Sequence, residues 1–284
     1  LAETFSTKEE IINLPLFRNN IDQKKIYIWG EQGIGDQIIF SRFFKNLHSS
    51  GKEMYVKINP KLIKLFERSF PYLNFVENFE KDKVQCHMPI GNLGKFFINN
   101  IEDVKHNSTA YLKVNKEKSN KYKQILPSGK LICGISWESK SSGTGKSKSL
   151  SLKKLKKILN MPEYIFVDLQ YGDTSEERQE FFKNYGIKIF KVEEIDNLND
   201  LESLTSLIEC CDMVLTVSNT TAHYAGGIGK KTFLMLPRGK GNLWYWSKNK
   251  DCSIWYESIK IFQQSAANEW SNLIDRVYNQ MTIK

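Results

Sequence analysis

A short glycine-rich segment near the N-terminus, Gly30-Glu31-Gln32-Gly33-Ile34-Gly35-Asp36, holds residues that suit the binding of an anion. Gly33 and Gly35 permit a tight turn and let a ligand approach the backbone closely. The helix expected after them presents free N–H groups, and Asp36 stands at its start, where capping is its simplest role. The segment fails as a dinucleotide fingerprint, because Ile38 occupies the position of the third glycine.

A second loop, residues 141–148, is basic and rich in hydroxyl groups and glycine. It resembles the end of a P-loop, but Lys140 stands where that motif requires its first glycine, so we reject an ATPase. The loop follows an apolar run at 131–137, and phosphate groups bind at the carboxyl ends of such strands in doubly wound folds. The sequence therefore predicts a phosphate-contacting loop, with a purely solvated loop as the alternative.

A third segment, Ser218-Asn219-Thr220-Thr221-Ala222-His223, follows the apolar run 213–217 and begins a helix. Hydroxyl groups, free amides and a helix N-terminus gather at one place, which predicts an anion site. A lone histidine is usually structural, but the place of His223 at the carboxyl end of a strand favours a functional role. Further on, the aromatic residues 244–246 and 255–256 form either a small hydrophobic cluster or a platform for a sugar or a base.

Apolar runs alternate with helical patterns along the chain, which predicts an α/β fold with mostly parallel, doubly wound sheets. The polar, Lys-rich stretch 115–130 contains Pro127 and predicts a linker between two Rossmann-like domains, 1–125 and 126–284. A last amphipathic helix is expected at 269–281. The expected strands are 25–30, 53–58, 74–77, 84–88, 131–137, 164–169, 188–192, 213–217 and 232–236, and the other expected helices are 37–47, 61–70, 152–159, 176–184, 198–209 and 221–227.

The composition of the 284 residues is that of an ordinary globular protein, with 40% hydrophobic and 26% charged residues. No apolar stretch approaches the ~20 residues that span a bilayer, and Leu1–Thr4 lack the features of a signal peptide, so we expect none. Five cysteines without a C-x-x-C pair favour a reducing cytoplasm over a disulfide framework or a zinc site. The net charge of +9 favours anionic partners, but nothing resembles a nucleic-acid-reading motif.

Several segments, taken in order, resemble the heptosyltransferase-like glycosyltransferases of family 9, especially those fused behind bacterial tetratricopeptide repeats. The resemblance implies a GT-B fold, in which two Rossmann-like domains face each other across a cleft, with the final helix packing back toward the first domain. The segments that carry it are 30–43, 134–137, 148–152, 168–170, 212–226, 253–256 and 262–264.

The resemblance also implies an activity: inverting transfer of a hexosyl or heptosyl group from a nucleotide diphosphate sugar, without a required metal or other cofactor. The acceptor would be a glycan, a lipopolysaccharide or a protein, and the enzyme would work in the cytoplasm or at the inner membrane surface. Asp36 matches the family's general base, and His223, Asn219 and Thr220 match its phosphate and sugar contacts. The remaining expected donor or acceptor contacts are Gly33, Gly35, Gln37, Trp137, Lys146, Lys148, Gln170, Glu176, Ser218 and Thr221.

General chemistry agrees with this expectation, since glycosyl transfer needs a base for the acceptor and a positive environment for the leaving diphosphate. No D-x-D sequence follows an expected strand, so helix N-termini and lysines would replace a metal. Two positions depart from the family, which usually has Asp where Ser218 stands and Arg where Tyr245 stands. Because of Ser218, a catalytically silent module that binds a nucleotide sugar or a glycan remains an alternative function. A nucleic-acid-binding protein is a further alternative, supported only by the net charge.

Overall fold

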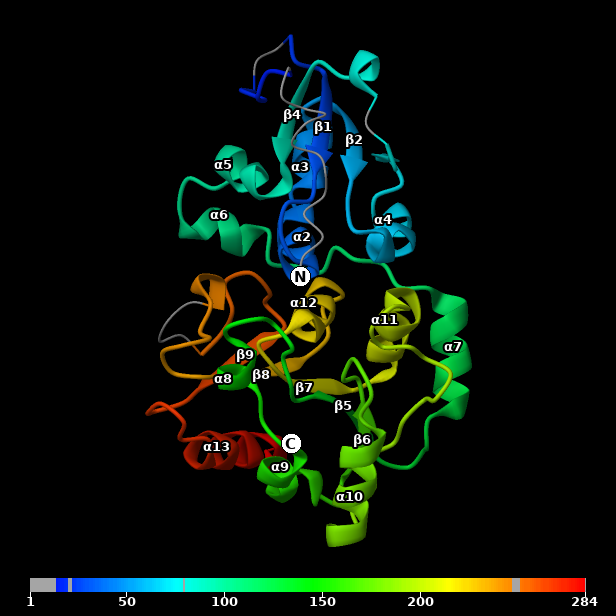
Figure 1. Ribbon diagram of the computed structural model, residues 1–284, viewed down its shortest axis with the longest axis vertical. Helices are drawn as coiled ribbons and strands as arrows, with labels where there is room; N and C mark the ends of the chain where they lie inside the picture. The colour runs from blue at the N-terminus through cyan, green and yellow to red at the C-terminus, as the bar shows by residue number, and fades with distance from the viewer. Residues whose placement is uncertain (1–13, 20–21, 79, 247–250, 284) are drawn as a thin grey trace. The chain divides into compact units, whose positions relative to one another are not determined.

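The computed structural model describes residues 14–19, 22–78, 80–246 and 251–283. The expectation of no signal peptide concerns Leu1–Thr4, which lie outside these residues. The chain forms two compact units (Figure 1). The first runs to Asn107 and includes Tyr111–Lys113, and the second holds Ser108–Ala110 and the chain from Val114 onward.

The first unit is built on a parallel four-stranded sheet with the order β3-β2-β1-β4. Its strands are β1 (Lys25–Trp29), β2 (Glu53–Lys57), β3 (Asn74–Phe75) and β4 (Cys86–Pro89). Its helices are α2 (Ile34–Ser41), α3 (Phe44–Ser49), α4 (Ile63–Ser69), α5 (Gly94–Phe97) and α6 (Ile101–His106), with 3-10 turns η1 (Pro60–Leu62), η2 (Lys81–Lys83) and η3 (Ile90–Leu93).

The helix expected at 37–47 is divided into α2 and α3. The Ser41 hydroxyl donates to the carbonyl of Ile38 at 2.8 Å, and Arg42 Nε donates to the carbonyl of Ile39 at 3.1 Å. These side chains compete with backbone N–H groups for the carbonyls, so the chain turns where one longer helix was predicted.

The second unit holds a parallel five-stranded sheet with the order β6-β5-β7-β8-β9. Its strands are β5 (Leu131–Ser136), β6 (Tyr164–Asp168), β7 (Met213–Val217), β8 (Thr232–Leu236) and β9 (Ile259–Gln263). Every residue of β7 and β8 is buried, because these strands lie inside the sheet and helices cover its faces. The helices are α7 (Lys116–Ile125), α8 (Gly145–Lys148), α9 (Leu152–Leu159), α10 (Ser175–Tyr185), α11 (Leu201–Cys210), α12 (Thr220–Gly227) and α13 (Ser271–Thr282), with the 3-10 turn η4 (Trp244–Trp246).

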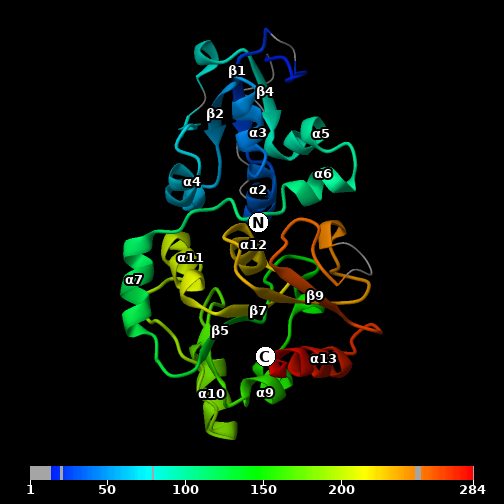
Figure 2. The same ribbon diagram turned by 180° about the vertical axis from the view of Figure 1, so that it is seen from behind.

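The predicted linker is wrong in part, because α7 forms within it. Asn115 caps this helix by accepting from Lys118 N, and the buried Tyr122 faces inward. The helix packs against α11, where Lys118 Nζ donates to Ser203 Oγ at 2.7 Å, and both views show the two helices side by side (Figure 2). The compact units therefore divide the chain near Val114, whereas the boundary was predicted between residues 125 and 126.

The strand expected at 188–192 does not form, and only Phe190 bridges to Val167 of β6. Conversely, β9 was not predicted as a strand, although Ile259, Ile261 and Phe262 are buried. Helix α13 packs on α9 and β9 through its apolar stripe of Leu273, Ile274, Val277 and Met281. Its predicted packing toward the first domain stays a prediction. Among the described helices, none has the length and apolar character needed to cross a bilayer.

Candidate functional site

Buried polar residues gather at the carboxyl ends of β5 and β7. After β5 the chain enters β6 on one side of it, and then returns to β7 on the other side. Ligands of open parallel sheets bind at such a switch point, outside the carboxyl ends of the strands. The basic loop 141–148 follows β5, and Ser218–His223 follows β7, so the fold brings two of the predicted anion-binding segments to the same edge.

Asn219 joins the two strand ends. Its Nδ2 donates to Ser136 Oγ at 2.7 Å and to the Glu138 carbonyl at 2.9 Å. Its Oδ1 accepts from Thr221 N at 3.0 Å as the N-cap of α12, and from Thr216 Oγ1 at 3.1 Å. The amide therefore uses both donor hydrogens and accepts two bonds, which makes Asn219 a positioning residue. Thr220, next to it, is half-buried, and Thr221 is buried.

Gln170 continues this polar framework from the end of β6. Its Oε1 accepts three hydrogen bonds of 2.9–3.0 Å, from Ser136 Oγ, Trp137 N and Glu138 N. The side chain is 1% exposed, so it shapes the backbone after β5 from inside the protein. Trp137 was also predicted to contact substrate, but its indole is fully buried and donates to Glu177 Oε2 at 2.8 Å. The Trp137 side chain therefore packs in the core. Only the backbone beside it could contact a ligand.

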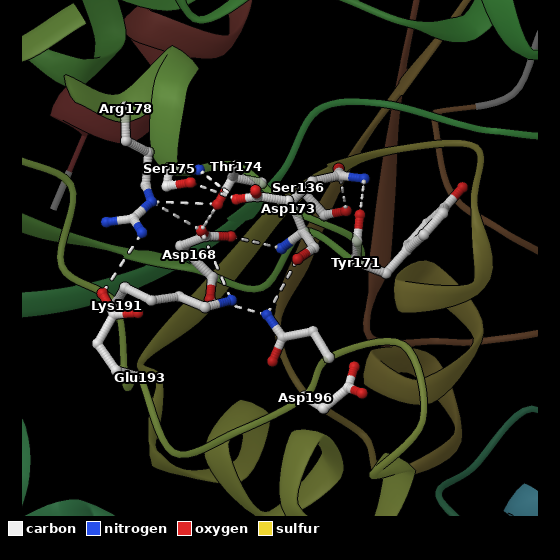
Figure 3. A network of polar contacts seen from close by, with 12 residues as sticks. Ser136, Asp168, Tyr171, Asp173, Thr174, Ser175, Arg178, Lys191, Glu193 and Asp196 are labelled. Atoms are coloured by element: carbon white, nitrogen blue, oxygen red, sulfur yellow. Dashed lines mark hydrogen bonds and ion pairs between the residues drawn. The ribbon is translucent and has the colours of Figure 1, made fainter. Parts of the chain in front are cut away.

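Asp168 is the centre of a buried ionic network at the end of β6 (Figure 3). Its Oδ2 accepts from Thr174 Oγ1 at 2.5 Å and lies 3.2 Å from Arg178 Nε and 3.6 Å from Lys191 Nζ. Burial raises the pKa of this carboxyl, while Lys191, the Thr174 and Gln170 hydrogen bonds and Arg178 lower it. The network ties β6 to the loop before α10 and to the segment after it.

The loop after β5 is folded back on itself by serine hydroxyl groups. Ser139 N donates to Ser149 Oγ at 2.9 Å, and this hydroxyl donates to the Gly145 carbonyl at 2.8 Å. A Cβ at Gly145 would lie 2.2 Å from the Ser139 carbonyl oxygen, so only glycine fits there. The loop is therefore more ordered than a solvated surface loop.

The two lysines predicted to meet phosphate differ in their surroundings. Lys146 is exposed, whereas Lys148 is 4% exposed. Burial lowers the pKa of the Lys148 ammonium. Among the described residues, no carboxylate is within salt-bridge distance of it. A buried cation without a counter-charge is costly, and a bound anion would offset that cost.

His223 is 3% exposed and lies in an aromatic cage. Its ring stacks on Trp246 with centroids 5.0 Å apart, and its Nδ1 lies 3.1 Å from the Tyr256 hydroxyl oxygen. Ser218 contributes to the same cage, because its Oγ accepts from Trp246 Nε1 at 2.9 Å. The aromatic residues after β8 therefore position the start of α12. This contact agrees with the hydrophobic cluster that was one of the two alternatives, and the platform for a sugar or a base stays a prediction.

Asp36 lies at the corresponding edge of the first sheet. It occupies the third position of α2, and Gly33 is the N-cap, in an extended conformation that any residue adopts. Burial raises the pKa of Asp36, while hydrogen bonds from the backbone N–H groups of Asp36 and Gly33 lower it. Gly35 lies in the first turn of α2. Gln37 is buried and bridges two loops, donating to the Gln32 carbonyl at 3.0 Å and accepting from Asn59 N at 2.9 Å.

Glu31 interacts electrostatically with Asp36 and was not among the residues expected at the site. A Cβ at Gly91, in the 3-10 turn η3 after β4, would lie 2.5 Å from Glu31 Oε1, so this glycine makes room for the carboxylate. Burial raises the pKa of Glu31, a hydrogen bond from the Gly91 backbone lowers it, and the neighbouring Asp36 raises it further. Because Gly91 is 60 residues away in the sequence, the local motif gave no sign of this pairing.

Glu176, expected near a ribose, is exposed in the first turn of α10. The next residue, Glu177, is engaged by Trp137 and by Leu152 N at 2.9 Å. Glu176 is therefore the acid of this pair that faces solvent.

No group of three or more potential metal ligands is present among the described residues.

Several solved structures of glycosyltransferases superpose on this chain. A family 9 glycosyltransferase from Veillonella parvula superposes with a TM-score of 0.58 at 10% identity, over 85% of this chain and 86% of that one. The Escherichia coli ADP-heptose lipopolysaccharide heptosyltransferase II gives 0.58 at 11% identity, over 90% and 97% of the two chains. The chain has the GT-B fold of the heptosyltransferase-like glycosyltransferases. The E. coli heptosyltransferase WaaC, solved with ADP, shares this fold with a TM-score of 0.57 at 7% identity, over 90% and 98% of the chains.

The heptosyltransferase-like fold confirms the predicted fold class, and the placing of the two units across a cleft stays a prediction. No protein-family model matches the chain. Among curated proteins, protein FlbA from Caulobacter vibrioides is 24% identical in a match that covers 89% of this chain and 46% of FlbA. The chain thus spans about half the length of this relative.

Proposed function

We propose that the chain is a glycosyltransferase that moves a sugar from a nucleotide diphosphate sugar to a glycan, a lipopolysaccharide or a protein. Its second unit would bind the donor and its first unit would hold the acceptor. The observation that carries this proposal is Lys148, whose side chain is 4% exposed and whose ammonium is partly desolvated, in a loop that follows the switch-point strand β5 of a heptosyltransferase-like fold. Donors with ADP are the first to test, because heptosyltransferase structures were solved with ADP and with an ADP-heptose analogue.

The proposed reaction inverts the anomeric carbon and needs no metal. Asp36 accepts the proton of the acceptor hydroxyl while that oxygen attacks the sugar, and the bond to the diphosphate breaks. Lys148, the exposed Lys146 and the N-terminus of α12 stabilise the charge that develops on the leaving diphosphate. Asn219 and Gln170 hold these strand ends in place, and His223 fixes the first turn of α12 through its aromatic cage.

Replacing Lys148 by Met is expected to weaken nucleoside diphosphate binding by roughly 10–100-fold, because a charge-assisted contact contributes about 1.5–3 kcal/mol. The melting temperature should stay unchanged or rise, since the variant removes a desolvated charge and keeps an apolar side chain of similar length in the same buried place. Titration calorimetry with ADP, GDP, UDP and CDP measures the affinity. Lys153→Met, on the exposed face of α9, is the matched control and should bind like the wild type. Equal affinity in both variants would place the diphosphate elsewhere.

Replacing Glu31 by Gln is expected to move the acid limb of the pH–rate profile to lower pH. The base must be ionised to act, so activity is lost as the pH falls through the pKa of Asp36, which burial has raised. The two carboxylates repel each other when both are ionised, so removing the Glu31 charge favours the ionised form of Asp36 and extends activity to lower pH. The measurement is the initial rate of transfer as a function of pH, with Glu67→Gln on α4 as the control. An acid limb that does not move would mean that Glu31 does not influence the base.

A catalytically silent module that binds a nucleotide sugar or a glycan is the second candidate. Ser218 favours it, because this buried hydroxyl is engaged by the Trp246 indole where the family usually has a carboxylate. Such a module would bind nucleotide sugars and release no nucleoside diphosphate from them, either by transfer or by slow hydrolysis. A cytoplasmic or inner-membrane location and a tetratricopeptide module before this chain belong to the same proposal and stay predictions.

A further inference from the structure

The free edge of the second sheet is incompletely covered. Strand β6 is one of the two edge strands, and Phe190 pairs with only its carboxyl half. Phe190 N donates to the Phe166 carbonyl at 2.8 Å, and Asp168 N donates to the Phe190 carbonyl at 2.8 Å. The chain reaches Phe190 from Gly186, a left-handed residue at φ 68° that ends α10.

One rung of a parallel ladder is missing just before Phe190. Leu131 N donates to the Glu163 carbonyl and Leu169 N donates to the Ile135 carbonyl, so the odd-numbered residues of β6 bond to β5 and the even-numbered ones face outward. Lys188 precedes Phe190 by two residues and would supply the next rung, to the Tyr164 carbonyl and the Phe166 N–H. Among the described backbone hydrogen bonds neither contact is made, because the chain departs from the strand there.

A groove of about 490 Å³ opens at this missing rung. A groove of this volume can hold a small molecule or a short segment of a longer ligand. Two exposed lysines, Lys130 and Lys188, also line it. The apolar side chains that line it are Leu159, Met161, Tyr164, Phe166, Ile187 and Phe190.

We propose that this groove binds an extended peptide segment in which an apolar residue is flanked by acidic residues. The central residue would supply the missing rung, its N–H donating to the Tyr164 carbonyl and its carbonyl accepting from the Phe166 N–H, parallel to β6. A backbone donor and acceptor at the spacing of one rung favour a main chain as the ligand, and the apolar lining receives the central side chain. The two exposed lysines that line the groove match acidic neighbours of that residue. This site does not depend on the proposed glycosyl transfer.

The test uses the full chain and a fluorescein-labelled, end-capped peptide, Glu-Val-Leu-Val-Glu, with fluorescence anisotropy as the readout. Binding is expected, together with slower hydrogen exchange at the Phe166 amide. N-methylation of the central leucine removes its N–H and is expected to weaken binding by roughly tenfold or more. Equal binding of the methylated peptide would overturn strand addition and leave a groove that accepts any small apolar molecule.

A second experiment reverses the charge of the two lysines that line the groove. The double variant Lys130→Glu with Lys188→Glu is expected to lose roughly tenfold in affinity for the acidic peptide and to gain affinity for Lys-Val-Leu-Val-Lys. The matched control is Lys153→Glu with Lys183→Glu, two exposed lysines outside the groove. If the control loses as much affinity as the groove variant, attraction to the overall positive charge explains the binding and the proposal fails. Sedimentation of the chain alone reports whether a second copy occupies the edge, an outcome that would also contradict it.

Discussion

Replacing Asp36 by Asn is expected to lower the rate of sugar transfer by about 10²–10⁴-fold, the usual contribution of a general base. The amide keeps the size of the side chain and still accepts a hydrogen bond from the Gly33 backbone, but it takes up no proton. Burial raises the pKa of the carboxyl, which makes Asp36 a better base than an exposed aspartate while leaving it in contact with the start of α2. Donor affinity and melting temperature should therefore stay close to those of the wild type.

The control for Asp36 is Asp103, which occupies the same third position of α6 and completes a capping box there. Its carboxylate accepts from Asn99 N at 2.7 Å and Asn100 N at 3.1 Å. Asp103→Asn changes a capping carboxylate in the same unit without touching the proposed site. Transfer should survive in Asp103→Asn and disappear in Asp36→Asn. Equal activities in the two variants would leave Asp36 as a helix cap and direct the search for a base to His223.

Replacing Asp168 by Ala is expected to destabilise the second unit by about 3–5 kcal/mol, because it leaves Arg178 and Lys191 without their buried counter-charge. For a unit of this size the loss corresponds to a fall in melting temperature of roughly 6–20 °C. Thr174 Oγ1 and Gln170 N also lose their acceptor, so the backbone after β6 loosens and nucleoside diphosphate affinity should fall as well. Differential scanning calorimetry of the full chain measures the first effect.

Glu193→Gln serves as the control for this network. Glu193 contacts the same Arg178, with Nη2 3.4 Å from Glu193 Oε1, but its side chain is 76% exposed. An exposed pair contributes about 0–1 kcal/mol, so this variant should melt close to the wild type. If Asp168→Ala has the same melting temperature as Glu193→Gln, the buried network does not hold the end of β6 in place.

The strands were predictable because a buried parallel strand is a short run of apolar residues, as 131–136 and 213–217 are. The loops after them were predictable for the same reason, since glycines, hydroxyls and lysines interrupt those runs. The strand at 188–192 has a similar local pattern and failed. Whether a segment pairs with an edge strand depends on where the preceding helix releases the chain, and Gly186 directs it away until Phe190.

The electrostatic character of the site could not be predicted from local sequence. Lys146 and Lys148 look equivalent in a basic loop, yet one is exposed and the other is buried. The cage around His223 draws Trp246 and Tyr256 from residues 23 and 33 positions further along the chain. Helix α7 was assigned to a linker because its surface is polar, and only Ser119 and Tyr122 are buried on its inner face. Each of these features depends on tertiary contacts.

Release of nucleoside diphosphate from a panel of nucleotide sugars, measured for the wild type and Asp36→Asn in parallel, tests the proposed function most directly. The panel includes ADP-, GDP-, UDP- and CDP-linked sugars, with and without a bacterial glycan extract as acceptor. The proposal predicts that the wild type releases the diphosphate from at least one donor, faster with the acceptor, and that Asp36→Asn binds this donor but releases little. Binding of donors with no release by the wild type, or equal release by both proteins, would contradict it.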